Sequence, residues 1–144
     1  MLVIESGAFH PQSDRAMDYA KSYYARIRKQ SSDCRRISVN TAMPIESVSA
    51  VKSHIFYNYH NLDSGFKRFS PSFEVAESWV RLQGNDKSAI QHHDITMLRH
   101  ALCELKYMLS TGCSYETAHN YAQSRHNYAK EAARYYRRVF GINI

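Results

Sequence analysis

The sequence predicts an all-α fold, in a single compact domain of five or six helices over residues 1–144. A length of 144 residues suits one domain with one core, and a chain that is 44% hydrophobic and 22% charged is expected to fold. Glycine and proline are scarce, at 5 and 3 residues, which disfavours a β sandwich with many turns. Apolar residues also recur at helical spacing in several segments.

The N-terminal part is predicted to contain three helices, after a start over residues 1–10 that is expected to be disordered. The first helix covers residues 11–30, where apolar side chains recur at helical spacing. A short second helix ends near Thr41. Pro44 lies in the first turn of the third helix, where its missing N–H costs least. The apolar face of this third helix comprises Val48, Val51 and Ile55.

The next segment is predicted to combine a turn, a short extended piece and a helix. Residues 61–65, "NLDSG", have the composition of a turn, and residues 66–69, "FKRF", are expected to form a loop or a short extended piece. Ser70 and Pro71 mark the start of a helix that ends before the polar break at residues 83–88. Its apolar stripe comprises Phe73, Ala76, Trp79 and Val80.

A helix over residues 94–109, closed by Gly112, is predicted to carry two stripes. The apolar stripe is expected to face the core, and it comprises Ile95, Leu98, Leu102, Leu105 and Leu109. The polar stripe lies roughly opposite and comprises His93, His100, Glu104 and Tyr107. His100 and Glu104 are i,i+4 neighbours that can touch, and Asp94 at the helix start is stabilised by the helix macrodipole.

Ser114 is predicted to cap one long final helix that reaches about Val139. An alanine-rich seam at alternating three- and four-residue spacing runs along it and comprises His119, Ala122, His126, Ala129 and Ala133. This seam is expected to pack against another helix, so both of its histidines need polar partners.

The chain carries a formal charge of +6, and 12 of its 19 basic residues are arginine. Arginine favours bidentate contacts with phosphate or carboxylate, so nucleic acid is an expected partner, although an acidic protein or a membrane surface fits the charge alone. Three cysteines without C-x-x-C spacing favour free thiols in a reducing compartment. No segment approaches transmembrane length, so the expected location is cytoplasmic and no membrane partner is expected.

The histidine-bearing segments indicate an acid–base or metal site. The candidate catalytic residues are His54, His60, His93, Asp94, His100, Glu104 and His119. Imidazoles can exchange the protons of phosphodiester cleavage while an arginine holds the phosphate, and Arg68 and Arg81 are the candidate substrate-binding residues. No metal set is assigned, but His93, Asp94 and His100 are the candidate ligands if the reaction uses a divalent metal. In the alternative, the histidines only pack in the core or lie on a solvated face.

Several common catalytic signatures are absent from the sequence. It contains no H-E-x-x-H, no serine nucleophile elbow, no Walker loop and no G-x-G-x-x-G. Chemistry on nucleoside triphosphates or dinucleotides is therefore not expected.

Residues 37–56 offer a competing interpretation, a helix-turn-helix whose second helix would enter the DNA major groove. Ala42 and the Met43-Pro44 dipeptide stand where a tight turn belongs. The turn lacks glycine, however, and Glu46 near the reading end would repel phosphate. A helical hairpin with no nucleic-acid role is the alternative.

Several motifs recur in a characteristic order over roughly residues 37–131, from "NTAMPIESVSAVKSHIF" through "FKRFSPSFEVAESWVRLQ" and "HHDITMLRHALCELKYM" to "SYETAHNYA" and "HNYAKE". The matching positions are His54, His60, Arg68-Phe69, Pro71, Trp79, Arg81-Leu82, His93-Asp94, His100, Glu104 and Ala118-His119. In this order they resemble a small α-helical module found at the C-terminal tips of secreted bacterial polymorphic toxins and in phage-linked proteins.

The resemblance implies a toxin effector domain that is delivered from another cell, or is active inside its own, and that a small immunity protein neutralises. Many modules at such tips are nucleases, so cleavage of RNA or DNA in the cytoplasm is the expected activity. Histidine-based acid–base chemistry and metal-assisted chemistry both fit this expectation. The alternatives are a DNA-binding protein that uses residues 37–56 and a phage-associated helical interaction protein without catalysis.

Overall fold

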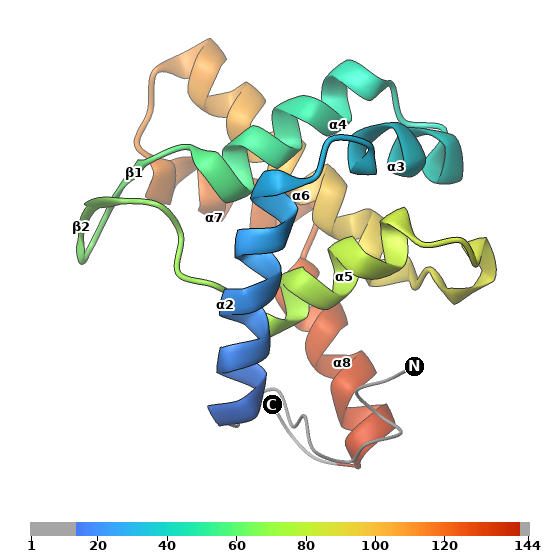
Figure 1. The fold of residues 1–144 in the computed structure, drawn as a ribbon. Helices are drawn as coiled ribbons and strands as arrows, with labels where there is room; N and C mark the ends of the chain where they lie inside the picture. Colours follow the sequence, from blue (N-terminus) through green and yellow to red (C-terminus); the bar gives the residue numbers. More distant parts are fainter. Residues whose placement is uncertain (1–13, 142–144) are drawn as a thin grey trace.

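Seven α-helices make up most of residues 14–141, the part of the chain that the computed structural model describes, and confirm the predicted all-α class (Figure 1). The count is higher than the predicted five or six. The disorder expected over residues 1–10 lies outside the described residues. The only sheet in residues 14–141 is a two-stranded antiparallel hairpin, in which His60 pairs with Lys67.

The elements follow one another as α2 (Asp14–Lys29), α3 (Asp33–Thr41), α4 (Ile45–Lys52), the π-helix η1 (Ser53–Tyr57), β1 (His60–Leu62), β2 (Gly65–Lys67), α5 (Phe73–Gln83), the 3₁₀ turn η2 (Lys87–Ala89), α6 (His92–Thr111), α7 (Tyr115–Arg125) and α8 (Tyr128–Phe140).

Trp79 of α5 is fully buried in the main core, in one apolar cluster with side chains from α2, α3, α4, η1 and α6. The ring of Phe56 packs edge-on against it, with 5.1 Å between ring centroids. The predicted apolar faces of α4 and α5 are largely confirmed, because Val48, Val51 and Ala76 are fully buried, whereas Val80 is only partly buried. In Figure 1, α5 lies behind α2, and the two helices are in contact.

A buried aspartate joins three elements beside this core. Asp33, at the start of α3, is only 1% exposed. Its carboxylate accepts hydrogen bonds from Lys52 Nζ at 2.9 Å and from Trp79 Nε1 at 3.0 Å. The burial of the Lys52 ammonium and of the indole N–H therefore depends on this carboxylate, since a buried polar group without a partner is costly.

The predicted apolar stripe of α6 is partly wrong. Leu98 is fully buried and Leu105 is partly buried, but Leu109 is 82% exposed. The most deeply buried positions of α6 instead include Met97, Ala101 and Glu104, with exposed fractions of only a few per cent. The physical reason is that α6 contacts α4 and α5 as well as α7 and α8, so part of its polar stripe is covered by the last two helices.

The predicted long final helix is also wrong, because it breaks at His126 and Asn127 into α7 and α8. Ser114 caps α7 as predicted, accepting a hydrogen bond from the backbone N–H of Thr117 at 3.2 Å. Asn127 caps α8 in the same way, through the backbone N–H of Lys130 at 3.1 Å. The break ends the predicted seam.

Among the seam positions, Ala122 is fully buried, whereas Ala129 is exposed. The start of α5 also differs from the predicted start at Ser70 and Pro71, because the helix begins after an N-cap at Ser72. Local capping by short polar side chains therefore decides both boundaries.

Replacing Asp33 with alanine is expected to lower the free energy of unfolding by about 3–5 kcal/mol, because it leaves a buried ammonium without its counter-charge. Urea denaturation followed by circular dichroism measures this change. The matched control is Asp18→Ala on the exposed face of α2, which should change stability by less than about 0.5 kcal/mol. Equal effects of the two substitutions would contradict the role given to Asp33.

Candidate active site

Glu104 of α6 is buried and accepts hydrogen bonds from three imidazoles. Its Oε1 lies 2.9 Å from His54 Nε2, and its Oε2 lies 2.8 Å from His100 Nε2 and 2.6 Å from His119 Nδ1. With His60, which hydrogen-bonds the backbone of His54, these residues are called the histidine–glutamate cluster. Five of the seven predicted catalytic residues are thus brought together from η1, β1, α6 and α7.

The π-helix η1 places His54 in the cluster. Its wider turn is marked by a hydrogen bond from the backbone N–H of Asn58 to the carbonyl of Ser53, at 2.8 Å and five positions apart. Short π-helical turns are often found at functional sites. The chain then enters β1, where Nε2 of His60 donates to the carbonyl of His54 at 2.9 Å. The hairpin thereby supports the backbone that carries His54.

The break between α7 and α8 fixes His100. Nδ1 of His100 lies 2.9 Å from the carbonyl oxygen of His126, at the C-terminal end of α7. A carbonyl only accepts hydrogen bonds, so Nδ1 carries the proton of this contact. His100 is consequently held at both ring nitrogens, by His126 on one side and Glu104 on the other.

An aromatic wall and a small cavity adjoin the cluster. The ring of Phe69 stacks on His60, with 4.3 Å between centroids, and lies 5.0 Å from the ring of Tyr115. The hydroxyl of Tyr115 is 3.3 Å from His119 Nδ1. A cavity of about 210 Å³ lies here, and its lining includes Ile55, Met97, His100, Glu104, Tyr115 and His119. A small polar group could enter beside the cluster.

The electrostatics favour a charged carboxylate at the centre. Burial by itself raises the pKa of Glu104, but hydrogen bonds from His100, His119 and His54 outweigh burial, so the pKa lies well below its usual range. Burial also lowers the pKa of His100, whereas its hydrogen bond with Glu104 and the charge of that carboxylate raise the pKa above its ordinary value. Burial lowers the pKa of His60.

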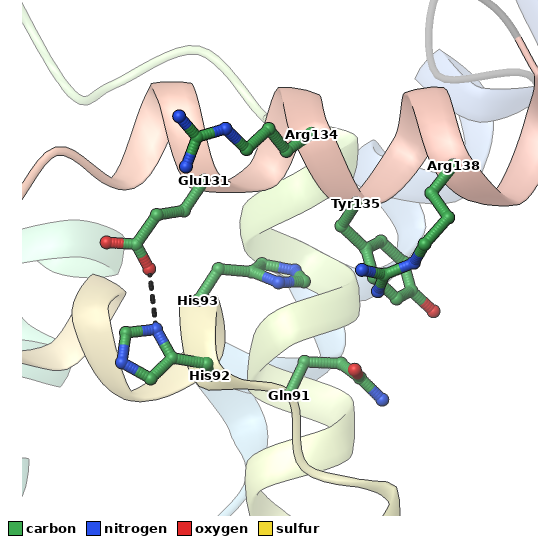
Figure 2. A pocket seen from close by; sticks show the side chains of 7 residues that line it. All are labelled: Gln91, His92, His93, Glu131, Arg134, Tyr135 and Arg138. Atoms are coloured by element: carbon green, nitrogen blue, oxygen red, sulfur yellow. Dashed lines mark hydrogen bonds and ion pairs between the residues drawn. The ribbon is translucent and has the colours of Figure 1, made fainter.

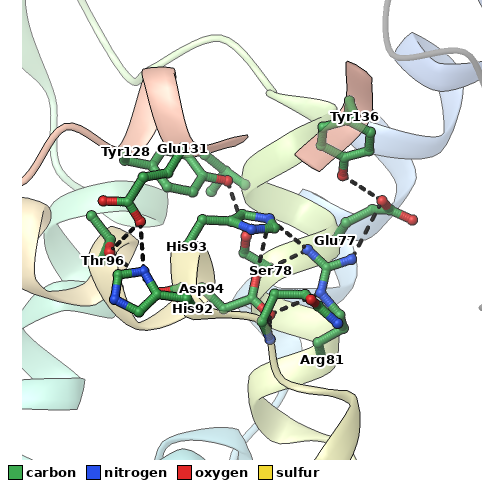
Figure 3. Close-up of polar contacts among 12 residues, drawn as sticks. Glu77, Ser78, Arg81, His92, His93, Asp94, Thr96, Tyr128, Glu131 and Tyr136 are labelled. Carbon is green, nitrogen blue, oxygen red and sulfur yellow. Dashed lines mark hydrogen bonds and ion pairs between the residues drawn. The ribbon is translucent and has the colours of Figure 1, made fainter. Parts of the chain in front are cut away.

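Three other predicted site residues, Arg81, His93 and Asp94, form a separate buried network (Figure 3). Arg81 holds Asp94 through two hydrogen bonds, Nε to Oδ2 at 2.8 Å and a terminal nitrogen to Oδ1 at 2.9 Å. A terminal nitrogen of Arg81 also lies 3.1 Å from His93 Nε2. Glu77 pairs with Arg81 at 3.5 Å and accepts a hydrogen bond from Tyr136 of α8. This network ties α5, α6 and α8 together.

The ring of His93 is almost fully buried within its network. Its ring is 4% exposed and lies 4.8 Å from the ring of Tyr135. Figure 2 shows that His93 lines a cavity of about 230 Å³ between α6 and α8, with Arg134 and Arg138 on the α8 side. On the neighbouring surface, His92 pairs with Glu131 at 2.9 Å.

Arg68 contacts the backbone and an aromatic ring near the hairpin. Its Nε donates to the carbonyl of Tyr57 at 3.1 Å, and its guanidinium lies 5.2 Å from the ring centre of Tyr59. Arg81 is buried against carboxylates. Both predicted substrate-binding arginines are thus engaged elsewhere, Arg68 by the backbone of Tyr57 and Arg81 by Glu77 and Asp94.

The predicted metal ligands His93, Asp94 and His100 do not converge. Asp94 is occupied by Arg81, and His93 belongs to the same network. Among residues 14–141, the set whose ligand atoms do meet is His100, Glu104 and His119.

Two contributors were absent from the sequence-based site: the hydroxyl of Tyr115 and the backbone carbonyl of His126. Tyr115 lies four positions before His119, a spacing that places both side chains on one side of a helix. This spacing was a usable signal. No sequence signal identifies the carbonyl of His126.

The helical hairpin predicted within residues 37–56 is present, but its exposed face is poorly suited to DNA. Ala42 makes the turn in the left-handed region, with φ of 64°. Lys52 is the only basic residue of α4 and is buried against Asp33, whereas Glu46 faces solvent. Binding to DNA phosphates depends on accessible cations, so α4 does not favour groove recognition.

Comparisons with known proteins give no match for this chain among protein-family models, curated proteins or solved structures. The resemblance to a toxin module therefore stays a prediction. Within residues 14–141, no helix combines the length and the apolar composition that crossing a bilayer requires.

The His93 network is expected to make stability depend on pH. Burial lowers the pKa of His93 from 6.5 to about 4. Between pH 6.5 and 4, His93 is therefore protonated in the unfolded chain but neutral in the folded protein. Stability is then fully present above pH 6.5 and falls as the pH drops towards 4, by roughly 3 kcal/mol from this residue. Urea denaturation at several pH values measures the fall.

His93→Gln keeps an acceptor for Arg81 and should flatten this part of the pH profile. His92→Gln is the matched control, because the side chain of His92 is 83% exposed, and it should keep the slope of the unmodified protein. An unchanged slope in His93→Gln would show that His93 does not carry the effect.

Proposed function

We propose that the protein is a toxin effector domain that hydrolyses phosphodiester bonds in nucleic acid, with the histidine–glutamate cluster as its reaction centre. The observation that carries the proposal is the convergence of Glu104, His100 and His119 beside a cavity. Groups that exchange protons near neutral pH, oriented by a buried carboxylate, are the parts that hydrolysis requires.

His119 is the member of this set that a substrate can reach. Its side chain is 39% exposed, compared with 12% for His100 and 4% for His54. Its Nδ1 is held by Glu104, and in residues 14–141 no hydrogen bond engages its Nε2. A carboxylate that holds one nitrogen of an imidazole fixes the orientation of the ring, which suits proton transfer between the other nitrogen and a substrate.

The charge around the cluster supports an anionic substrate. The chain carries a net charge of +6, and Arg99 and Arg125 are exposed near the end of α7. Burial is the largest cause that lowers the pKa of His126, and the charges of Arg99, His100 and Arg125 lower it further. Positive charge therefore lies close to His126, whose backbone carbonyl holds His100. A polyanion is attracted to such a surface.

In the proposed reaction, water attacks phosphorus, one group takes the proton of the water, and a second protonates the leaving oxygen. The cluster can supply these steps directly or can hold a divalent ion that activates the water. The resemblance supports two further parts of the proposal: action in the cytoplasm after delivery from another cell, and neutralisation by a small immunity protein.

Tightly controlled expression in bacteria tests the proposal. The unmodified chain should stop growth and degrade RNA or DNA, whereas His119→Ala and Glu104→Gln should each lower cleavage about 10²–10⁴-fold, the usual contribution of a positioned proton-transfer group. His92→Ala replaces an exposed histidine outside the cluster and should leave cleavage unchanged.

Circular dichroism checks that each variant is folded. Arrested growth with intact RNA and DNA would overturn the nuclease assignment. Normal growth at confirmed expression of the folded chain would overturn the toxin assignment.

A further inference from the structure

We infer that His100, Glu104 and His119 form a binding site for a transition-metal ion of the Zn²⁺ class. The three atoms that would bind the ion are His100 Nε2, Glu104 Oε2 and His119 Nδ1. The inference stands on their geometry, and it rests on the proposed function only for what the bound ion would do.

Loss of the protons that His100 Nε2 and His119 Nδ1 share with Glu104 leaves three acceptor atoms facing one another. Nδ1 of His100 carries its proton towards the carbonyl of His126, so Nε2 of the neutral ring presents a lone pair. This lone pair lies 2.8 Å from the Oε2 atom of Glu104, which as a carboxylate oxygen also only accepts. Without a shared proton or a cation, these two acceptors repel each other in a buried place. A metal ion satisfies both at once.

The atoms behind two of the three ligands are arranged as they are around known metal centres. A histidine that binds a metal usually donates its other N–H to a carbonyl or a carboxylate, and His100 does so to His126 at 2.9 Å. The second oxygen of Glu104 is held by His54 Nε2 at 2.9 Å. Glu104 is thereby left with one free oxygen, which suits a single bond to an ion.

The separations are close to those of a tetrahedral site. With bonds of about 2.1 Å, neighbouring ligand atoms lie about 3.4 Å apart. His100 Nε2 and His119 Nδ1 are 3.3 Å apart. The two distances from Glu104 Oε2, at 2.8 and 2.6 Å, need to open by about 0.8 Å at most to reach that spacing. His119 is half-exposed and is free to make this small movement.

The ligand types favour zinc over magnesium or calcium. Two imidazole nitrogens and one carboxylate oxygen are a common catalytic zinc set, with the fourth position left for water. The three ligand residues and Tyr115 all line the same cavity, which has room for that water. The hydroxyl of Tyr115, 3.3 Å from His119 Nδ1, is a donor that a water in this cavity would meet. A zinc-bound water loses its proton near neutral pH.

The Arg81 network offers a natural comparison, because it also contains a histidine and a carboxylate. There the guanidinium of Arg81 already lies against both oxygens of Asp94, at 2.8 and 2.9 Å. A positive charge is therefore built into that network, and a metal ion has no place in it. The histidine–glutamate cluster contains no arginine or lysine among its members.

Zinc binding to the full chain, expressed without a histidine tag and dialysed against a chelator, tests the inference. Competition with a chromophoric chelator should show one tight Zn²⁺ site per chain and no comparable affinity for Mg²⁺. Co²⁺ in place of zinc should give the visible absorption of a tetrahedral ion. His100→Asn, Glu104→Gln and His119→Asn should each weaken binding by more than about 100-fold, since loss of a supporting residue alone costs 10–100-fold.

The matched control is His92→Asn, which should bind zinc as the unmodified chain does. A chain that binds no zinc, or whose binding survives His100→Asn and Glu104→Gln, overturns the metal site. If a substituted chain does not fold, the Co²⁺ spectrum of the unmodified chain decides, because a spectrum without the tetrahedral bands overturns the inference.

Cleavage that continues in excess chelator, from a chain that binds no zinc, would overturn the metal site and leave the proposed nuclease in place. Tight zinc binding without any cleavage would support the site and overturn the nuclease.

Discussion

The buried carboxylate of Glu104 is the interaction on which the candidate site depends. A carboxylate that is 4% exposed stays charged only when donors surround it, and here the donors arrive from η1, α6 and α7. The charge on Glu104 therefore depends both on the packing of α7 on α6, which brings His119, and on the π-helical turn, which brings His54. This constraint explains why a polar stripe, and not the leucine stripe, lies under α7.

Helix α6 carries two buried carboxylates, Asp94 and Glu104, which are stabilised by different kinds of partner. Asp94 near its start is neutralised by an arginine, and the result is a rigid link to α5 and α8. Glu104 further along is hydrogen-bonded to imidazoles, which can gain or lose protons. The same residue types therefore serve structure at one place and offer chemistry at the other, and the presence of a fixed cation distinguishes them.

Much of the fold followed from the sequence, because helical periodicity and the scarcity of glycine and proline are local signals. The apolar faces of α4 and α5, the cap at Ser114 and the left-handed C-cap at Gly112 are of this kind. The break at His126 and Asn127 was missed because a competing cap interrupts a continuous periodic pattern. For the site, the contact between His100 and Glu104 was predictable from their i,i+4 spacing. The separation of His93 and Asp94 from the cluster was not, because it depends on where Arg81 of another helix arrives.

The long separations within the histidine–glutamate cluster have a consequence for folding. His54 and Glu104 are 50 positions apart in the sequence, and the carbonyl that fixes His100 comes 26 positions after it. Contacts of this kind require the closure of long loops, which is entropically costly and occurs once much of the chain is ordered. A newly made or partly unfolded chain would hold the same histidines as separate, solvated side chains. The histidine–glutamate cluster is therefore expected to form only once α7 has packed on α6, late in folding.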